Sequence, residues 1–252
     1  MTTHFSIPSD WYQTFFTDPV IRFWDAAVPA AATEADVAFV VRHVGASPPA
    51  TLLDVPCGSG RHALALTRAG FTVTGVDLSE AALGRASAFA HAAGLAVRFI
   101  RSDMLNLEVD TLSDGLVCLG NSFGYFEPGL SHQLLRQFAA ALRAGGRLIL
   151  DTSICAESVL PIVAERNFSF PEGSYEQEIT YDPRQSIIQT RAQLIIDGER
   201  HELRYRHFVM TSGELLRSLR AAGFNLLALY GDAQDGAFAP GSPRLLLVAV
   251  KD

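Results

Sequence analysis

Between residues 51 and 151, short apolar runs alternate with helical patterns, and this alternation constrains the fold more than any other feature of the sequence. It is typical of repeated βαβ units, in which parallel strands form one sheet and helices cover its faces. We expect strands at residues 51–55, 72–76, 97–100, 115–120 and 147–151, with helices at 61–69, 79–92 and 129–143. Gly70, Gly94 and Gly145 stand just past these helices, where a left-handed residue commonly ends a helix. The sequence therefore predicts a doubly wound α/β domain.

The segment before this core, residues 9–44, has a helical pattern and carries many aromatic side chains. Its rings are those of Trp11, Tyr12, Phe15, Phe16, Phe23 and Trp24. They either pack the segment onto the sheet or form a lid that closes over a ligand. In the second case Tyr12, Phe16 and Trp24 are candidate contacts to the ligand.

After residue 151 the pattern changes to extended segments between residues 167 and 210. Two of them, 189–196 and 199–210, flank Asp197-Gly198, a pair suited to a type I′ hairpin turn. A helix follows Thr211, which has Glu214 at capping-box spacing, and strands at 224–230 and 244–250 end the chain. We thus expect four parts: an N-terminal helical segment (1–45), an α/β core (46–152), an antiparallel β insertion (153–210) and the C-terminal part of the core (211–252).

Composition argues against several classes of protein. With 252 residues, 48% of them hydrophobic and 19% charged, the chain can bury a sizeable core and should be soluble and globular. No apolar run approaches the roughly 18 residues that span a bilayer, and the start lacks a basic segment followed by an apolar one. We therefore expect a cytoplasmic protein that does not contact membranes. A net charge of -7 argues against recognition of nucleic acid phosphates.

The three cysteines, Cys57, Cys118 and Cys155, are odd in number and far apart in the sequence. None of them has the close Cys or His neighbours of a metal site. The sequence therefore predicts free thiols and no metal.

The strongest local signal is the stretch from Leu52 to His62, an apolar strand that runs into a glycine turn and opens a helix. Gly58, Ser59 and Gly60 let the backbone approach a ligand closely, and the helix start presents free N–H groups to it. Asp77 ends the second strand, where a carboxylate can accept hydrogen bonds from both hydroxyls of a ribose. This arrangement predicts a nucleoside-binding site.

Two kinds of nucleoside cofactor remain open at this point. Gly58 and Gly60, with Ala63 in third place, fit the dinucleotide fingerprint and allow a nicotinamide-dependent reductase. Asp54, at the end of the first strand, would repel a pyrophosphate and instead suits a cationic amino group. Asp103, directly after the third strand, can accept a hydrogen bond from an adenine amino group. Each acid alone could be a capping or turn residue, but the three together match amine, ribose and adenine in one ligand.

With these residues the sequence resembles the class I S-adenosylmethionine-dependent methyltransferases, over about residues 35–250. The matching stretches are Leu52-Leu-Asp54-Val-Pro-Cys-Gly58-Ser-Gly60, Val73-Thr-Gly-Val-Asp77-Leu-Ser79, Ser102-Asp103-Met104 and Asp114-Gly-Leu-Val-Cys-Leu-Gly-Asn121-Ser-Phe. The family implies a Rossmann-like, mostly parallel sheet of seven strands whose last strand is antiparallel. That sheet would account for the two strands at the end of the chain.

The resemblance also implies which residues bind S-adenosylmethionine and its product S-adenosylhomocysteine. Asp54 and the glycine turn would lie near the methionine end, Asp77 on the ribose, and Asp103 with the backbone of Met104 at the adenine. The candidate cofactor contacts are Asp54, Pro56, Cys57, Gly58, Ser59, Gly60, Arg61, Asp77, Leu78, Ser102, Asp103, Met104, Leu119, Gly120, Asn121 and Ser122. Pro56 departs from the family, which commonly has glycine there, but a strand end tolerates proline.

The acceptor side carries weaker signals. The stretch from Gly120 to Phe126 lacks the Asn/Asp-Pro-Pro-Tyr element by which related enzymes hold the exocyclic amine of a nucleobase or glutamine. The insertion resembles the substrate-covering elements of small-molecule methyltransferases, including those acting on sugar amines and glycine. Tyr125 and then His207 are the candidate catalytic residues, while Phe123 and Tyr205 are further candidate contacts. Tyr205 and His207 share one strand face by the two-residue period.

We therefore expect N- or O-methylation of a small-molecule acceptor by in-line methyl transfer, in which alignment and exclusion of water do most of the work. The alternatives are an NAD(P)-dependent reductase and a non-catalytic module that binds S-adenosylmethionine. The sequence does not identify the acceptor, and a homodimer formed through the Asp197-Gly198 hairpin is a further hypothesis.

Overall fold

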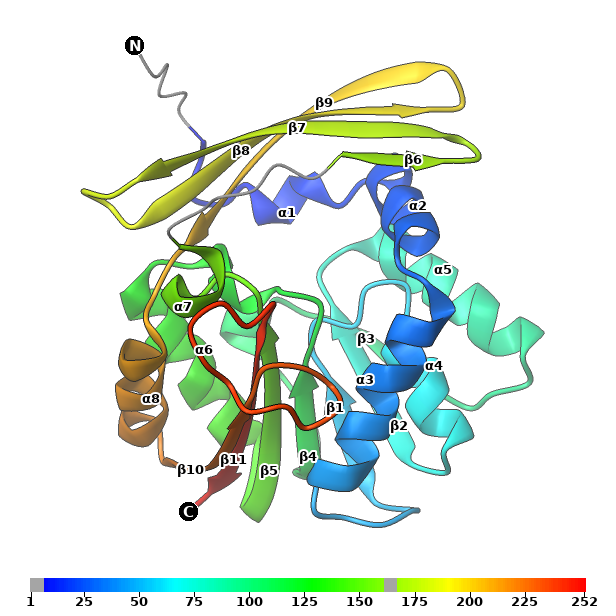
Figure 1. Cartoon of the computed structure of the whole chain (residues 1–252). Coiled ribbons are helices and arrows are strands. Elements are labelled where there is room, and N and C mark those ends of the chain that lie inside the picture. Colours follow the sequence, from blue (N-terminus) through cyan, green and yellow to red (C-terminus); the bar gives the residue numbers. More distant parts are fainter. Residues whose placement is uncertain (1–6, 161–166) are drawn as a thin grey trace.

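The computed structural model describes residues 7–160 and 167–252. Its main element is a seven-stranded sheet with the order β10-β11-β5-β4-β1-β2-β3 (Figure 1). The strands are β1 (Thr51–Asp54), β2 (Thr72–Asp77), β3 (Arg98–Arg101), β4 (Ser113–Cys118), β5 (Leu142–Thr152), β10 (Phe224–Tyr230) and β11 (Leu245–Lys251). The first five pair in parallel, and β11 lies antiparallel to both β5 and β10. The predicted doubly wound fold is confirmed, and its order reverses at β1, where such sheets bind ligands.

Helices cover both faces of this sheet. They are α3 (Ala30–His43), α4 (Arg61–Arg68), α5 (Glu80–Ala92), α6 (Pro128–Ala141) and α8 (Ser212–Ala221). Phe39 of α3 and Leu66 of α4 belong to one apolar cluster, while Phe138 of α6 and Leu215 of α8 belong to another. The sheet between these clusters is apolar on both sides, as parallel sheets require. The predicted capping box of α8, between Thr211 and Glu214, is present.

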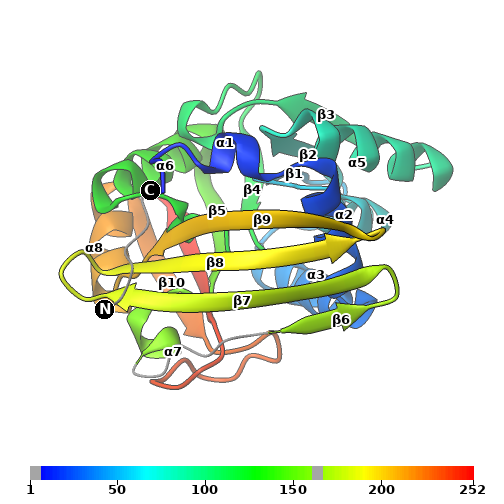
Figure 2. The same ribbon diagram turned by 90° about the horizontal axis from the view of Figure 1, so that it is seen from above.

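A second, four-stranded antiparallel sheet lies across the top of the molecule, over the edge where β1, β2 and β4 end (Figures 1 and 2). Its strands are β6 (Phe168–Phe170), β7 (Gly173–Asp182), β8 (Ile187–Ile196) and β9 (Glu199–Phe208). Asp197 and Gly198 join β8 to β9 with φ angles of 53° and 80°, as a type I′ turn requires. The predicted hairpin and antiparallel insertion are confirmed.

Two short helices, α1 (Tyr12–Phe15) and α2 (Asp18–Ala27), lie beneath this second sheet (Figure 1). Val20 and Phe23 of α2 pack on Tyr175 and Leu194 of the sheet, and the rings of Phe23 and Tyr175 stack at 4.6 Å. The Ser79 hydroxyl donates to the Phe16 carbonyl at 2.9 Å, which ties the segment to the main sheet as well. The N-terminal segment therefore bridges the two sheets.

The structure differs from the sequence prediction mainly at element ends. Helix α6 ends at Ala141 and β5 begins at the next residue, so Gly145, with φ of 74°, lies inside a strand and does not end a helix. The reason is a register shift in the pairing of β4 with β5 between Ser113 and Gly115, which a periodicity argument cannot foresee. Gly70 and Gly94 do follow their helices with positive φ, as predicted.

Three short elements were not predicted, namely η1 (Met104–Asn106), η2 (Phe123–Tyr125) and α7 (Ala156–Val159). All three follow a strand end of the main sheet. Among residues 7–160 and 167–252, no helix combines the length and the apolar character needed to cross a bilayer. The three cysteines are buried and unpaired.

Candidate cofactor and acceptor site

A cavity of about 740 Å³ separates the two sheets. Its floor consists of the residues that follow β1, β2, β3, β4 and β5, and its roof consists of α1, α2 and the inner face of the four-stranded sheet. Cavities of roughly 300–1,000 Å³ are usual for small ligands. The floor and roof carry different kinds of side chain.

The turn between β1 and α4 is held from two sides. The Gly58 N–H donates to the Asp77 carboxylate at 2.8 Å, and the Cys57 N–H donates to the Val76 carbonyl at 2.8 Å. Gly60 has φ of 84°, and a Cβ there would lie 3.0 Å from that of Ala86, so glycine is needed for both backbone and packing. Because Asp77 occupies the Gly58 N–H, the turn does not offer that donor to a pyrophosphate.

Asp77 is the central carboxylate of the floor. Its second oxygen accepts from the Ser79 N–H at 2.8 Å, and burial raises its pKa while these backbone hydrogen bonds oppose the rise. A carboxylate has about four acceptor positions, so Asp77 can still accept from hydroxyl groups in the cavity. This geometry suits the predicted ribose contact.

Asp103 lies at the end of β3 and caps the short helix η1 through the Leu105 N–H, at 2.9 Å. Its other oxygen accepts from the Tyr12 hydroxyl at 3.3 Å. Tyr12 comes from α1, so one lid residue directly contacts one candidate cofactor residue. Met104 and Ser102 line the cavity beside them.

Asp54 is the last residue of β1. Its side chain is fully enclosed beneath the turn, it does not line the cavity, and neither carboxylate oxygen has a hydrogen-bond partner among the described residues. Burial raises its pKa to about 7, although the nearby positive charge of Arg61 opposes the rise. The expected contact between Asp54 and the amine of a ligand stays a prediction.

Most other predicted residues line the cavity. Those on the cofactor side are Pro56, Cys57, Gly58, Ser59, Arg61, Asp77, Leu78, Ser102, Asp103, Met104, Leu119, Gly120, Asn121 and Ser122, and those on the acceptor or lid side are Tyr12, Phe16, Trp24, Tyr125, Tyr205 and His207. Gly60, at the end of the turn, does not line the cavity. Phe123, 1% exposed, points into the apolar core and is not part of the cavity wall.

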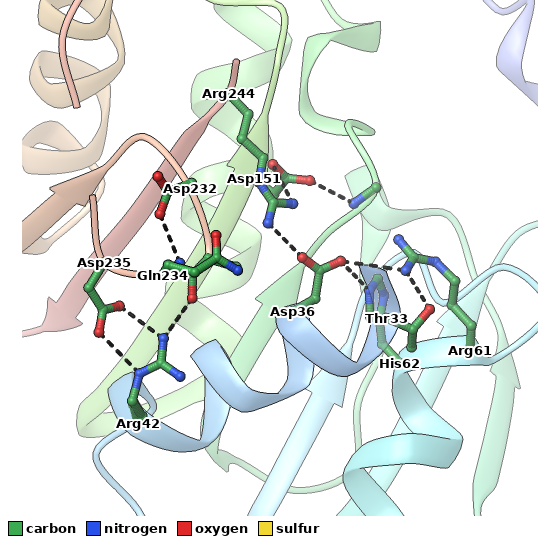
Figure 3. Close-up of polar contacts among 12 residues, drawn as sticks. Thr33, Asp36, Arg42, Arg61, His62, Asp151, Asp232, Gln234, Asp235 and Arg244 are labelled. Carbon is green, nitrogen blue, oxygen red and sulfur yellow. Dashed lines mark hydrogen bonds and ion pairs between the residues drawn. The ribbon is translucent and has the colours of Figure 1, made fainter. Parts of the chain in front are cut away.

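A buried polar network near the ends of β4 and β5 was not predicted (Figure 3). Asp36 of α3 is 5% exposed and pairs with Arg244 at 2.7 Å, with His62 at 3.1 Å and with Arg61 at 3.5 Å. Burial opposes ionisation of Asp36, but His62 and Arg244 lower its pKa to about 2. Burial also lowers the pKa of His62 to about 4, so the imidazole is neutral near pH 7.

Asp151 joins this network to the cavity. It lies at the end of β5, accepts from the Gly120 N–H at 3.2 Å and lies 3.7 Å from Arg244. Burial raises its pKa to about 6, and Arg244 opposes the rise. Asp151 and Arg244 both line the cavity, and the strand-end argument applied to Asp77 could have found them. Asp151 ends a parallel strand, and Arg244 precedes an antiparallel one, so both fall at the same sheet edge.

The roof brings together the predicted acceptor residues. The ring of His207 lies 5.5 Å from that of Tyr125 and 5.6 Å from that of Tyr205. Burial lowers the pKa of His207 to about 4 and raises that of Tyr125, so both are neutral near pH 7. No hydrogen bond to another described residue engages the His207 ring.

Comparison with known proteins agrees with this geometry. Residues 52–146 match the family described as Methyltransferase domain. The glycine/sarcosine N-methyltransferase of Aphanothece halophytica is 25% identical over 259 residues, which cover 97% of this chain and 92% of the relative.

Solved structures share the fold. An S-adenosylmethionine-dependent methyltransferase from Clostridium acetobutylicum superposes with a TM-score of 0.78 at 18% identity, covering 91% of this chain and 95% of the other. The CcbJ methyltransferase from Streptomyces caelestis superposes with a TM-score of 0.81 at 18% identity, covering 95% of this chain and 98% of the other. These similarities show the fold, and the family match over residues 52–146 agrees with the geometry of the cofactor side.

Proposed function

We propose that the protein transfers the methyl group of S-adenosylmethionine to a nitrogen or oxygen atom of a small molecule bound in the same cavity. The observation that carries this proposal is that one cavity is lined both by the glycine turn and strand ends and by Tyr125, Tyr205 and His207. Its volume of about 740 Å³ leaves room for a cofactor and an acceptor together.

On the cofactor side, Asp77 would accept hydrogen bonds from the ribose hydroxyls, and Asp103 with the Met104 backbone would lie at the adenine. The turn from Pro56 to Gly60 and the stretch from Leu119 to Ser122 would surround the methionine end. The fit rests on Asp77, which is half-buried and lines the cavity. Asp54 would support the turn from below.

At the methionine end, Arg61, Arg244 and Asp151 supply charged groups that reach the cavity. A cation and a carboxylate near each other suit the carboxylate and the ammonium of an amino acid. This assignment also explains why the protein holds Arg61 against Thr33 at 3.0 Å and Asp36 at 3.5 Å.

S-adenosylmethionine brings an already activated methyl group, so the protein has to orient the acceptor, exclude water and manage one proton. His207 is neutral near pH 7 and can accept the proton that a nitrogen or hydroxyl acceptor gives up. Tyr125 keeps its proton and can donate a hydrogen bond to the acceptor. Nitrogen is the favoured acceptor atom, since the relative from Aphanothece halophytica is named as an N-methyltransferase.

The proposal also covers the roles of two segments, the location of the protein and its oligomeric state. Residues 1–45 would act as a lid and residues 153–210 as the cover of the acceptor, and the protein would work in the cytoplasm. A homodimer through the Asp197-Gly198 turn is tested by the mass in solution, where a clean monomer removes it. The turn already pairs with Arg22 of its own chain at 2.6 Å.

Isothermal titration with S-adenosylhomocysteine and, separately, with NADH and NADPH tests the proposal. We expect micromolar binding of S-adenosylhomocysteine alone, and its loss in Asp77→Ala. Asp110→Ala is the matched control, because Asp110 is an exposed acid paired with Arg98, away from the cavity. Binding of a nicotinamide cofactor, or no binding of S-adenosylhomocysteine, would refute the proposal.

A further inference from the structure

The acceptor side of the cavity is walled by aromatic rings from three separate segments. Trp11 and Phe15 of the N-terminal segment lie 5.0 Å apart, and Trp11 lies 5.0 Å from Tyr125. Phe15 lies 5.1 Å from Tyr205, and Phe16 lies 6.1 Å from Tyr125. All five side chains line the cavity. Such a wall favours an acceptor that has a ring of its own or another large apolar part.

The same region offers no free positive charge among the described residues. The basic side chains that line the cavity are those of Arg61, His62, Arg244 and His207. Asp36 engages the first three, and Arg244 also faces Asp151 (Figure 3). His207 is neutral near pH 7.

Carboxylates outnumber guanidinium groups in the lining. They belong to Asp25, Asp77, Asp103 and Asp151, against Arg61 and Arg244. Burying a further carboxylate without a cation beside it costs several kcal/mol, so an anionic acceptor is disfavoured here. A cationic or neutral acceptor pays no such penalty.

One polar group stands out on the inner face of the four-stranded sheet. The hydroxyls of Tyr175 and Tyr205 lie 2.7 Å apart, so one of them donates to the other, and the second can donate to the Gln177 side-chain oxygen, which lies 3.3 Å from both. This bond orients the amide, and no hydrogen bond to a described residue engages the amide nitrogen. Gln177 lines the cavity and can therefore donate to a neutral oxygen of the acceptor.

We propose that the acceptor is a ring-bearing amine without a carboxylate group, whose ring lies against the wall of Trp11, Phe15, Phe16, Tyr125 and Tyr205 and whose polar end is bonded by Gln177. The inference rests on the proposed methyl transfer and narrows its substrate class. It separates this chain from the relative named for glycine and sarcosine, since both of those molecules carry a carboxylate.

The test titrates matched pairs of compounds into protein saturated with S-adenosylhomocysteine. Each ring-bearing amine is paired with the amino acid that differs only by a carboxylate: benzylamine with phenylglycine, phenethylamine with phenylalanine, and tyramine with tyrosine. Glycine and sarcosine complete the set. We expect the amine of at least one pair to bind about tenfold or more tightly than its partner, a difference of about 1.4 kcal/mol.

The proposal is overturned if glycine, sarcosine or the carboxylated partners bind as tightly as the amines, or if no ring-bearing amine binds. Prior binding of S-adenosylhomocysteine shows that the cofactor assignment stands, so the two proposals fail separately.

Gln177→Leu tests the polar contact. It should weaken the binding of tyramine, which has a hydroxyl group, several-fold and leave the binding of phenethylamine unchanged. Gln193→Leu is the matched control, because Gln193 is a half-buried glutamine on β8 that does not line the cavity. Equal weakening of the binding of both amines, or unchanged binding of tyramine, would show that Gln177 does not contact the acceptor.

Discussion

The floor and the roof of the cavity differ in what holds their polar groups in place. On the floor, backbone N–H groups fix the carboxylates of Asp77, Asp103 and Asp151, which lie at or just after the ends of β2, β3 and β5. On the roof, side chains fix one another, as Tyr175, Tyr205 and Gln177 do. The floor therefore follows from the fold, whereas the roof follows from the choice of side chains, and substrate range can change there without loss of the cofactor site.

The largest expected effect concerns the charged network that joins α3 to the floor. Asp36→Ala should lower the free energy of unfolding by about 3–5 kcal/mol, since it leaves Arg244 and Arg61 without their shared buried carboxylate. Chemical denaturation measures the loss. The exposed pair of Asp110 and Arg98 provides the control, and Asp110→Ala should cost under about 1 kcal/mol. Similar losses in both variants would show that the network does not stabilise the floor.

The second prediction uses the enclosed carboxylate of Asp54. Its pKa rises from 3.8 to about 7 on folding, so the folded state keeps a proton that the unfolded state loses. Stability should therefore fall as pH rises from about 4 to 7, by up to about 4 kcal/mol, and stay level above that. Asp54→Asn removes this contribution. The free energy of unfolding of the variant should therefore rise relative to that of the wild type as pH rises from about 4 to 7.

The comparison of Asp54→Asn with the wild type is made at each pH, because His62 and His207 titrate in the same window with the opposite sign. Their pKa values fall from 6.5 to about 4 on folding, so they favour folding as pH rises. Denaturant unfolding of both proteins at several pH values gives the difference. A difference that does not change with pH would mean that Asp54 titrates normally.

The third prediction concerns the roof. His207→Gln should lower kcat about 10–100-fold by removing the proton acceptor. His201→Gln is the matched control, because His201 lies on the same face of β9 but outside the cavity. Methyl-transfer assays with the acceptor found above compare the two variants. Equal activity of His207→Gln and wild type would exclude His207 from the proton transfer.

The smallest expected effect is at the surface between the lid and the hairpin. Arg22→Ala breaks an exposed ion pair with Asp197 and should leave the midpoint of thermal or chemical unfolding almost unchanged. Apolar packing of Phe23 on Tyr175 holds the two segments together instead. A large fall in the midpoint would mean that charge, and not packing, fixes the lid to the second sheet.

The floor was largely predictable from the sequence, because the alternation of apolar runs and the positions of glycines locate the strand ends. Asp77 and Asp103 stand at or just after those ends. Asp54 ends β1 as predicted, but the pattern does not indicate that its side chain is fully buried. Asp151 and Arg244 obey the same rule as Asp77 and could have been found from the strand order.

The roof was predictable only in outline. The Asp197-Gly198 pair signalled the hairpin, and the two-residue period put Tyr205 and His207 on one face. No sequence pattern indicated Asp36 or Gln177. Arg244 lies 208 residues from Asp36, and Tyr205 lies 28 residues from Gln177. Contacts at such separations follow from how the second sheet and α3 pack on the core, which periodicity does not encode.

The most direct test of the account is the affinity for S-adenosylhomocysteine of Asp77→Ala and His207→Gln, measured side by side by calorimetry. Asp77→Ala should bind about 100-fold more weakly, because about 2–3 kcal/mol of charge-assisted hydrogen bonding is lost, while His207→Gln should bind as the wild type does. Equal losses in both variants, or unchanged binding in Asp77→Ala, would contradict the claim that one cavity holds a cofactor site and an acceptor site built separately.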